Sequence, residues 1–126
     1  MTRFLLVFAG GGAGAGTRYL VGTWAGQRLG TSFPWGTLFV NLAGCFLLSL
    51  LMQLAVTTTM SPNLRLALTT GFMGGLTTYS TFNYETTKLL EEGALRAGLV
   101  NLGATALGCF AAGLCGLMLA RRLVGG

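Results

Sequence analysis

Charged residues are the scarcest class in this chain: only 9% of its 126 residues are charged, and only three are acidic. A soluble domain usually carries about 25% charge, so this composition excludes an ordinary water-soluble protein. Histidine is absent altogether, and without it the familiar zinc and haem sites lack a ligand. The remaining residues supply no nucleophile, base and metal set, which disfavours an enzyme.

Cysteine is also rare, and its placement excludes further classes. Cys45, Cys109 and Cys115 all fall within apolar segments. Their odd number and spacing fit neither a disulfide framework nor a metal site, so we interpret them as small buried side chains. The eight basic residues give a net charge of +5 but stand scattered along the chain. That pattern is typical of residues flanking membrane spans rather than of a nucleic-acid surface.

Apolar residues, in contrast, make up 52% of the chain and form continuous runs. A transmembrane helix needs about 20 such residues, so the length accommodates four helices with short connections. The runs cover residues 4–24, 35–56, 64–90 and 98–120, and Ser61-Pro62 separates the second from the third. A β-barrel is disfavoured because its strands would alternate with a period of two. We therefore predict an all-α membrane protein with one four-helix transmembrane domain over residues 1–126.

The first span contains a glycine-rich run from Gly10 to Gly16. Its spacing imitates a dinucleotide-binding loop, but that motif needs a preceding strand, whereas this run lies inside a continuous apolar segment. We instead expect small residues such as Gly12 and Gly16 to permit close packing of helices. Arg18, in the same span, has two open interpretations: a side chain that reaches back to the membrane surface, or a cation at the mouth of an anion pathway.

Polar residues inside the second and fourth spans must face protein or water, because lipid offers them no hydrogen bonds. Thr37 and Asn41 lie one turn apart on one face of the second span. The Asn41 amide has two open roles, a hydrogen bond between helices or donation of its N–H groups to a permeating anion. Asn101, Thr105 and Cys109 recur every four residues and so share one face. This stripe is either an interhelical contact or one wall of a hydrated path.

The third span is the least suited to lipid, because residues 71–85 contain three glycines, several hydroxyl residues and a carboxylate. Each glycine weakens a helix by about 1 kcal/mol relative to alanine, and Thr77 and Thr78 compete for backbone hydrogen bonds. We predict that the helix breaks near the bilayer midplane and frees carbonyl oxygens suited to a hard monovalent cation. The alternative is a kinked helix whose carbonyls bond to neighbouring hydroxyls.

Two aromatic residues of this span, Tyr79 and Phe82, are three apart and therefore lie on one face. Ring edges carry partial positive charge, so two edges beside a narrow path could replace part of the hydration of a small anion. The hydroxyls of Ser80 and Thr81 and the amide of Asn41 would assist. Simple packing of the two rings is the other interpretation.

Basic residues are balanced between the two sides of a four-span protein. One side holds Arg3, Arg65, Arg121 and Arg122, and the other holds Arg28, Lys88 and Arg96, with Arg18 nearer to it. The positive-inside rule therefore gives no preferred orientation. A chain that inserts both ways can pair with an inverted copy, and four spans are few for enclosing a polar pathway alone. We predict an antiparallel, dual-topology homodimer.

Three sequence motifs follow one another along the chain. The first span carries a glycine-rich run that leads into Arg18-Tyr19, the second carries GTLFVNLAG from Gly36 to Gly44, and the third carries GFMGGLTTYSTF from Gly71 to Phe82. Together they resemble the signatures of the Fluc/CrcB fluoride channel family, in the same order and across essentially the whole chain. Tyr79 is a departure, since the family commonly has phenylalanine at that position.

The resemblance implies a fluoride-selective channel: a dual-topology dimer with two fluoride pores and a central structural sodium ion, in the bacterial inner membrane. By motif, the carbonyls of Gly74 and Thr77 would hold the sodium. The fluoride pathway would be lined by Arg18, Thr37, Asn41, Tyr79, Ser80, Thr81, Phe82, Glu85, Asn101 and Thr105. A negative-inside membrane potential, worth about 2.3 kcal/mol per charge per 100 mV, would drive the anion out of the cell without coupling machinery.

Two other functions are considered as alternatives. A small proton-coupled multidrug exporter is also a four-helix, dual-topology dimer, but such coupling calls for a carboxylate deep in the membrane, typically on the first span. The first span here has no acidic residue, and Glu85 lies toward the end of the third. A membrane scaffold that transports nothing would tolerate replacement of Asn41 and Phe82 without consequence.

Overall fold

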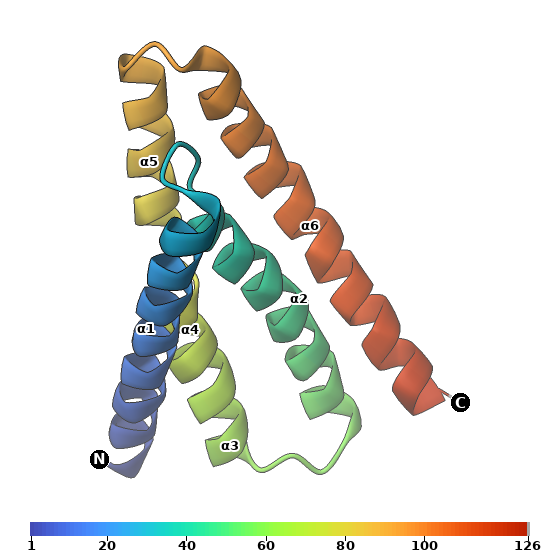
Figure 1. Ribbon diagram of the computed structural model, residues 1–126. Coiled ribbons are helices and arrows are strands. Elements are labelled where there is room, and N and C mark those ends of the chain that lie inside the picture. Colours follow the sequence, from blue (N-terminus) through green and yellow to red (C-terminus); the bar gives the residue numbers. More distant parts are fainter. Residues whose placement is uncertain (126) are drawn as a thin grey trace.

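The computed structural model describes residues 1–125, which are helical apart from short connections (Figure 1). Three helices are long and apolar enough to cross a membrane: α1 (Thr2–Leu29), α2 (Trp35–Thr57) and α6 (Leu95–Gly125). Between α2 and α6 the chain forms α3 (Pro62–Leu66), the π-helical segment η1 (Ala67–Met73), α4 (Gly74–Leu76) and α5 (Tyr79–Glu91). The prediction of an all-helical membrane protein is confirmed, and each long helix extends beyond the predicted span.

The helices run alternately up and down, as predicted. Figure 1 shows both ends of the chain and the connection between α2 and α3 at one end of the molecule, and the connection between α5 and α6 at the other. Ser61 begins α3, because its side-chain oxygen accepts a hydrogen bond from the N–H of Leu64 at 3.3 Å. Pro62 occupies the first helical position, where its missing N–H costs nothing.

Two close helix contacts hold the bundle together. In Figure 1, α2 and α6 lie side by side along most of α2, and α1 packs along η1 and α4. A Cβ atom at Gly14 would lie 2.8 Å from the backbone nitrogen of Leu76, and one at Gly75 would lie 2.9 Å from the carbonyl carbon of Gly11. The two backbones therefore meet directly, as small residues allow in membrane helices.

The glycines that make this contact are not the ones expected from the sequence. A Cβ at Gly10 would lie 2.5 Å from the carbonyl oxygen of Ala67, whereas a Cβ at Gly12 or Gly16 would meet no atom of residues 1–125 within 4 Å. Close packing of the glycine-rich run is confirmed, but Gly12 and Gly16 make no such contact within this chain. The run offers glycines on several faces, and the rotation of α1 against η1 selects one of them.

The cysteines are less buried than predicted. Cys45 and Cys109 are partly buried where α2 faces α6, and Cys115 is exposed. The interpretation of all three as buried side chains is therefore wrong for Cys115. Its apolar helix presents a face to the outside, which is expected where the surroundings are lipid.

The predicted break in the third run is confirmed, and it falls between α4 and α5. Thr77 (ψ 153°) and Thr78 (φ −152°, ψ 120°) are extended, whereas Gly74 is helical (φ −62°, ψ −37°). Gly74 itself therefore stays helical, whereas the competition expected of the two threonines is present, because the Thr77 hydroxyl donates to the Met73 carbonyl and the Thr78 hydroxyl accepts from the Thr81 N–H. Gly75 instead permits the contact with α1, and the break occurs at the two threonines.

Candidate functional site

Asn41 of α2 bonds to both polar groups of the broken backbone at Thr78. Its Nδ2 donates to the Thr78 carbonyl oxygen at 3.0 Å, and its Oδ1 accepts from the Thr78 N–H at 2.8 Å. Both residues are buried. Of the two roles left open for Asn41, the interhelical hydrogen bond is thus present. One N–H of the amide is not used by this pair.

Thr78 also begins α5 as its N-terminal cap. Its Oγ1 accepts from the N–H of Thr81 at 3.3 Å and lies 3.0 Å from the Thr81 hydroxyl and 3.4 Å from that of Ser80. Thr78 was not among the predicted site residues. The preference of threonine for helix N-caps is the signal that could have identified it.

Two of these hydrogen bonds, from the Thr78 N–H to Asn41 and from the Thr81 N–H to the Thr78 hydroxyl, leave the carbonyls of Gly74 and Thr77 without their helical donors. In an uninterrupted helix, each would accept from the N–H four residues later, that of Thr78 or Thr81. Those N–H groups instead donate to Asn41 Oδ1 and Thr78 Oγ1. The two carbonyls predicted to bind sodium have therefore lost their helical donors, and oxygen dipoles of this kind suit a hard monovalent cation.

Helix α2 contacts the break through the face that carries Asn41 and Gly44. Gly44 lies three residues after Asn41, and a Cβ there would collide with the Thr77 Cγ2 methyl group. The Thr77 hydroxyl donates to the carbonyl of Met73 at 2.9 Å. The absence of a side chain at Gly44 thus allows α2 to approach, and Asn41 then reaches the extended backbone one turn away.

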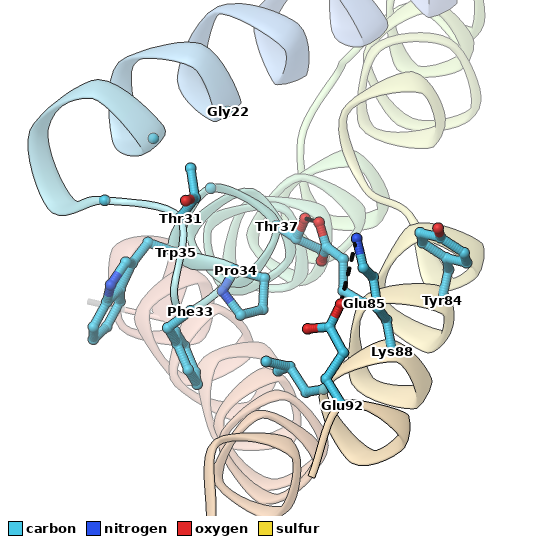
Figure 2. Close-up of a pocket in the computed structure, with 14 residues that line it drawn as sticks. Gly22, Thr31, Phe33, Pro34, Trp35, Thr37, Tyr84, Glu85, Lys88 and Glu92 are labelled. Atoms are coloured by element: carbon cyan, nitrogen blue, oxygen red, sulfur yellow. Dashed lines mark hydrogen bonds and ion pairs between the residues drawn. The ribbon is translucent and has the colours of Figure 1, made fainter. Parts of the chain in front are cut away.

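A hollow of about 330 Å³ opens between the α1–α2 connection and α5 (Figure 2). At its inner end the Thr37 hydroxyl donates to Glu85 Oε1 at 2.9 Å. The other carboxylate oxygen, Glu85 Oε2, is buried and has no hydrogen-bond partner within residues 1–125. At the rim, Lys88 and Glu92 form an exposed ion pair at 3.8 Å.

A second hollow, of about 510 Å³, adjoins the first and shares Thr37 and Glu85 with it. Arg18 of α1 and Thr81 of α5 line it as well. The structure therefore brings together four predicted pathway residues from three helices. Arg18 lies on the wall of this hollow.

The two aromatic residues of α5 contact each other. The ring centroids of Tyr79 and Phe82 lie 5.6 Å apart with an angle of 65° between the ring planes, an edge-to-face arrangement. Phe82 is only 5% exposed, whereas Tyr79 is 78% exposed. The Tyr79 ring thus has most of its surface available beyond this chain.

The polar stripe of α6 divides into two environments. Asn101, only 1% exposed, donates from Nδ2 to the Thr86 hydroxyl at 2.8 Å, and that hydroxyl donates to the carbonyl of Phe82 at 2.7 Å. Asn101 therefore joins α6 to α5 through Thr86, a residue the sequence analysis missed. The hydroxyl oxygen of Thr105 is buried without a partner among the described residues. Neither Asn101 nor Thr105 lines the two hollows described above.

Comparisons with known proteins identify the family of this chain. The family described as "CrcB-like protein, Camphor Resistance (CrcB)" matches residues 5–117. The chain is 49% identical to a protein of Sorangium cellulosum named fluoride-specific ion channel FluC, over 100% of both chains. It is likewise 49% identical to the protein of that name from Anaeromyxobacter dehalogenans, over 99% of this chain and 100% of the relative. A relative from Geobacter metallireducens is 47% identical over 90% and 92% of the two chains. This chain is therefore a member of the CrcB-like family, to which its sequence motifs had pointed.

Proposed function

We propose that this protein is a fluoride-selective channel that lets fluoride leave the cell passively and so lowers its concentration in the cytoplasm. The observation that carries the proposal is the 49% identity, over the full chain, to relatives named fluoride-specific ion channel. We further propose that the protein lies in the inner membrane of a bacterial cell. The apolar helices α1, α2 and α6 support a membrane location.

The arrangement of the site supports passage of a small anion. Fluoride is strongly hydrated, so it can cross only where closely spaced donors replace its water and still release it. The hydroxyl of Thr81 and the cation of Arg18 line the second hollow, where the Thr37 hydroxyl is already engaged by Glu85. Further along α5, the edge-to-face pair of Tyr79 and Phe82 offers ring edges to an anion. The unused N–H of Asn41 is an additional donor.

We propose that the working unit is an antiparallel homodimer of oppositely inserted chains. The end of the molecule that contains both termini carries four basic residues, and the opposite end carries a similar number, so neither orientation is favoured. The exposed surface of Tyr79 and of Gly74 beside the break leaves room for a second copy. Reporters fused to the C-terminus should be active on both sides of the membrane. Activity on one side alone would contradict dual insertion.

A structural sodium ion would fit the carbonyls of Gly74 and Thr77, which have lost their helical donors. An inverted partner would supply the same pair again and complete a set of four oxygens. Replacing sodium by N-methylglucamine, which is too large for such a site, should reduce the fraction of dimer measured by crosslinking. A dimer fraction independent of sodium, with the protein still folded, would exclude this role.

The decisive experiment is reconstitution of the full chain into liposomes loaded with both fluoride and chloride. Ion-selective electrodes should record rapid release of fluoride while chloride stays inside. Equal leakage of both anions, or of neither, would refute the proposal. Adding a pH gradient tests the proton-coupled exporter, which would move a cationic drug against its own concentration gradient and leave fluoride in place.

A further inference from the structure

Acidic side chains are confined to one end of the molecule. All three, Glu85, Glu91 and Glu92, lie in or directly after α5 near its connection to α6. The opposite end, where Figure 1 shows both termini and α3, carries four arginines and no acidic side chain. The two ends carry similar numbers of basic residues, but their net charges differ, because only the end near the connection between α5 and α6 also carries acidic side chains. One end is therefore strongly cationic, because its arginines have no acidic side chain beside them.

Two of these arginines come from different helices and line a common hollow. Arg3 belongs to the first turns of α1 and Arg65 to α3, and the hollow between them measures about 390 Å³. Thr69 and Thr70 add hydroxyl groups on one wall, and Met60 and Leu66 add apolar surface beside them. Arg121 and Arg122 lie at the same end of the molecule but do not line this hollow.

Neither arginine of the hollow is engaged elsewhere. Within residues 1–125 the ion pair between Lys88 and Glu92 is the only one, and it lies at the far end. Arg3 and Arg65 are exposed. The hydroxyl of Thr69 donates to the carbonyl of Arg65 at 2.8 Å, which fixes the backbone from which one guanidinium extends. Two guanidinium groups are thus available to one ligand.

We propose that this hollow binds the phosphate group of an anionic phospholipid. A guanidinium presents paired N–H donors that match phosphate oxygens, so two of them from separate helices can hold one phosphodiester. The hollow lies at one end of α1, a helix long and apolar enough to cross a membrane, and the end of such a helix lies in the headgroup layer. Its apolar residues would contact the glycerol and the first methylenes of the acyl chains. This mixture favours a lipid headgroup over a free phosphate ion, which would gain nothing from Met60 and Leu66.

The test measures lipid retention by the purified full-length protein with native mass spectrometry, using phosphatidylglycerol and phosphatidylcholine as the probes. The double variant Arg3→Gln/Arg65→Gln should bind phosphatidylglycerol at least about tenfold more weakly, because the loss of one charge-assisted hydrogen bond to phosphate already amounts to about that factor. Arg121→Gln/Arg122→Gln is the matched control, because it removes the same charge from the same end outside the hollow. It should bind within about twofold of the unaltered chain, because Arg121 and Arg122 do not line the hollow and no hydrogen bond to the bound phosphate is removed.

Further measurements separate the sources of phosphate and guard against misfolding. Arg3→Lys/Arg65→Lys keeps the charge but lacks the paired N–H donors, so it should restore the binding only in part, while thermal unfolding in phosphatidylcholine shows whether each variant is folded. With the unaltered chain, excess inorganic phosphate should displace little phosphatidylglycerol. Equal losses in both glutamine variants, no loss in either, or complete displacement by inorganic phosphate would each overturn the proposal. None of these readouts depends on fluoride transport, so they stand or fall separately from the proposed channel function.

Discussion

The Asn41 amide supplies the hydrogen bonds that a continuous helix would give Thr78, because it pairs with both the N–H and the carbonyl of that residue, at 2.8 and 3.0 Å. A break inside a membrane leaves polar backbone groups that lipid cannot satisfy. The side chain from α2 satisfies those of Thr78, and by occupying its N–H it also frees the carbonyl of Gly74. One hydrogen-bonded pair therefore both stabilises the break and exposes an oxygen.

Asn41→Ala should destabilise the protein strongly, because it leaves two buried backbone groups of Thr78 without partners. We expect a loss of about 2–4 kcal/mol in the free energy of unfolding, measured by denaturant titration in mixed micelles. Asn83→Ala is the control, because Asn83 is exposed on α5. If both variants unfold at the same denaturant concentration, the Asn41 amide does not support the break.

Thr37→Val should impair transport, because it removes the hydroxyl that donates to Glu85 at the junction of the two hollows while preserving the shape of the side chain. We expect fluoride efflux from liposomes to fall about tenfold, the equivalent of losing one hydrogen bond to a charged group. Thr37→Ser keeps the hydroxyl and should retain efflux close to that of the unaltered chain. Similar efflux in both variants would show that the hydroxyl at this junction plays no part in transport.

Gly75→Ala should destabilise the bundle, because the added methyl would meet the backbone of Gly11 on α1. Overpacking of this kind costs about 1–3 kcal/mol, which thermal unfolding in detergent can detect. Gly12→Ala makes the same chemical change where no atom lies within 4 Å. It should be neutral or stabilising by up to about 1 kcal/mol, because alanine favours helix. The reverse order of stability would mean that the other face of α1 makes the contact.

Thr86→Val should weaken the junction of α5 and α6, because it leaves the buried amide of Asn101 without its acceptor. We expect a loss of about 1–3 kcal/mol in the free energy of unfolding. Thr87→Val, at the exposed neighbouring position, tests whether the loss of any hydroxyl on α5 has the same effect. Equal stability of the two variants would argue that the Asn101 contact is dispensable.

Much of the fold could be predicted from the sequence, because local features decide it. Continuous apolar runs specify the long helices, Ser61-Pro62 specifies the start of α3, and the two threonines mark the place where the third run opens. The glycine-rich run was correctly assigned to helix packing. Its contact face could not be predicted, since a helix in lipid is apolar both toward its neighbours and away from them. Amphipathic periodicity, which shows the buried face of a soluble helix, is therefore weak here.

In the candidate site, too, the member residues could be predicted from the sequence but their contacts could not. Residue types and spacing were enough to select Thr37, Asn41, Glu85 and the aromatic pair as members of a polar region, and their family motifs pointed to fluoride. The partners of these residues depended on how α2, α5 and α6 are rotated against one another. Only that rotation pairs Asn41 with Thr78 and brings the Thr86 hydroxyl within hydrogen-bond distance of Asn101. Local sequence features are thus sufficient to predict a helical membrane protein with an interrupted third run. Which polar groups meet depends on the packing of the helices, because each such contact joins two helices whose relative orientation is set by packing.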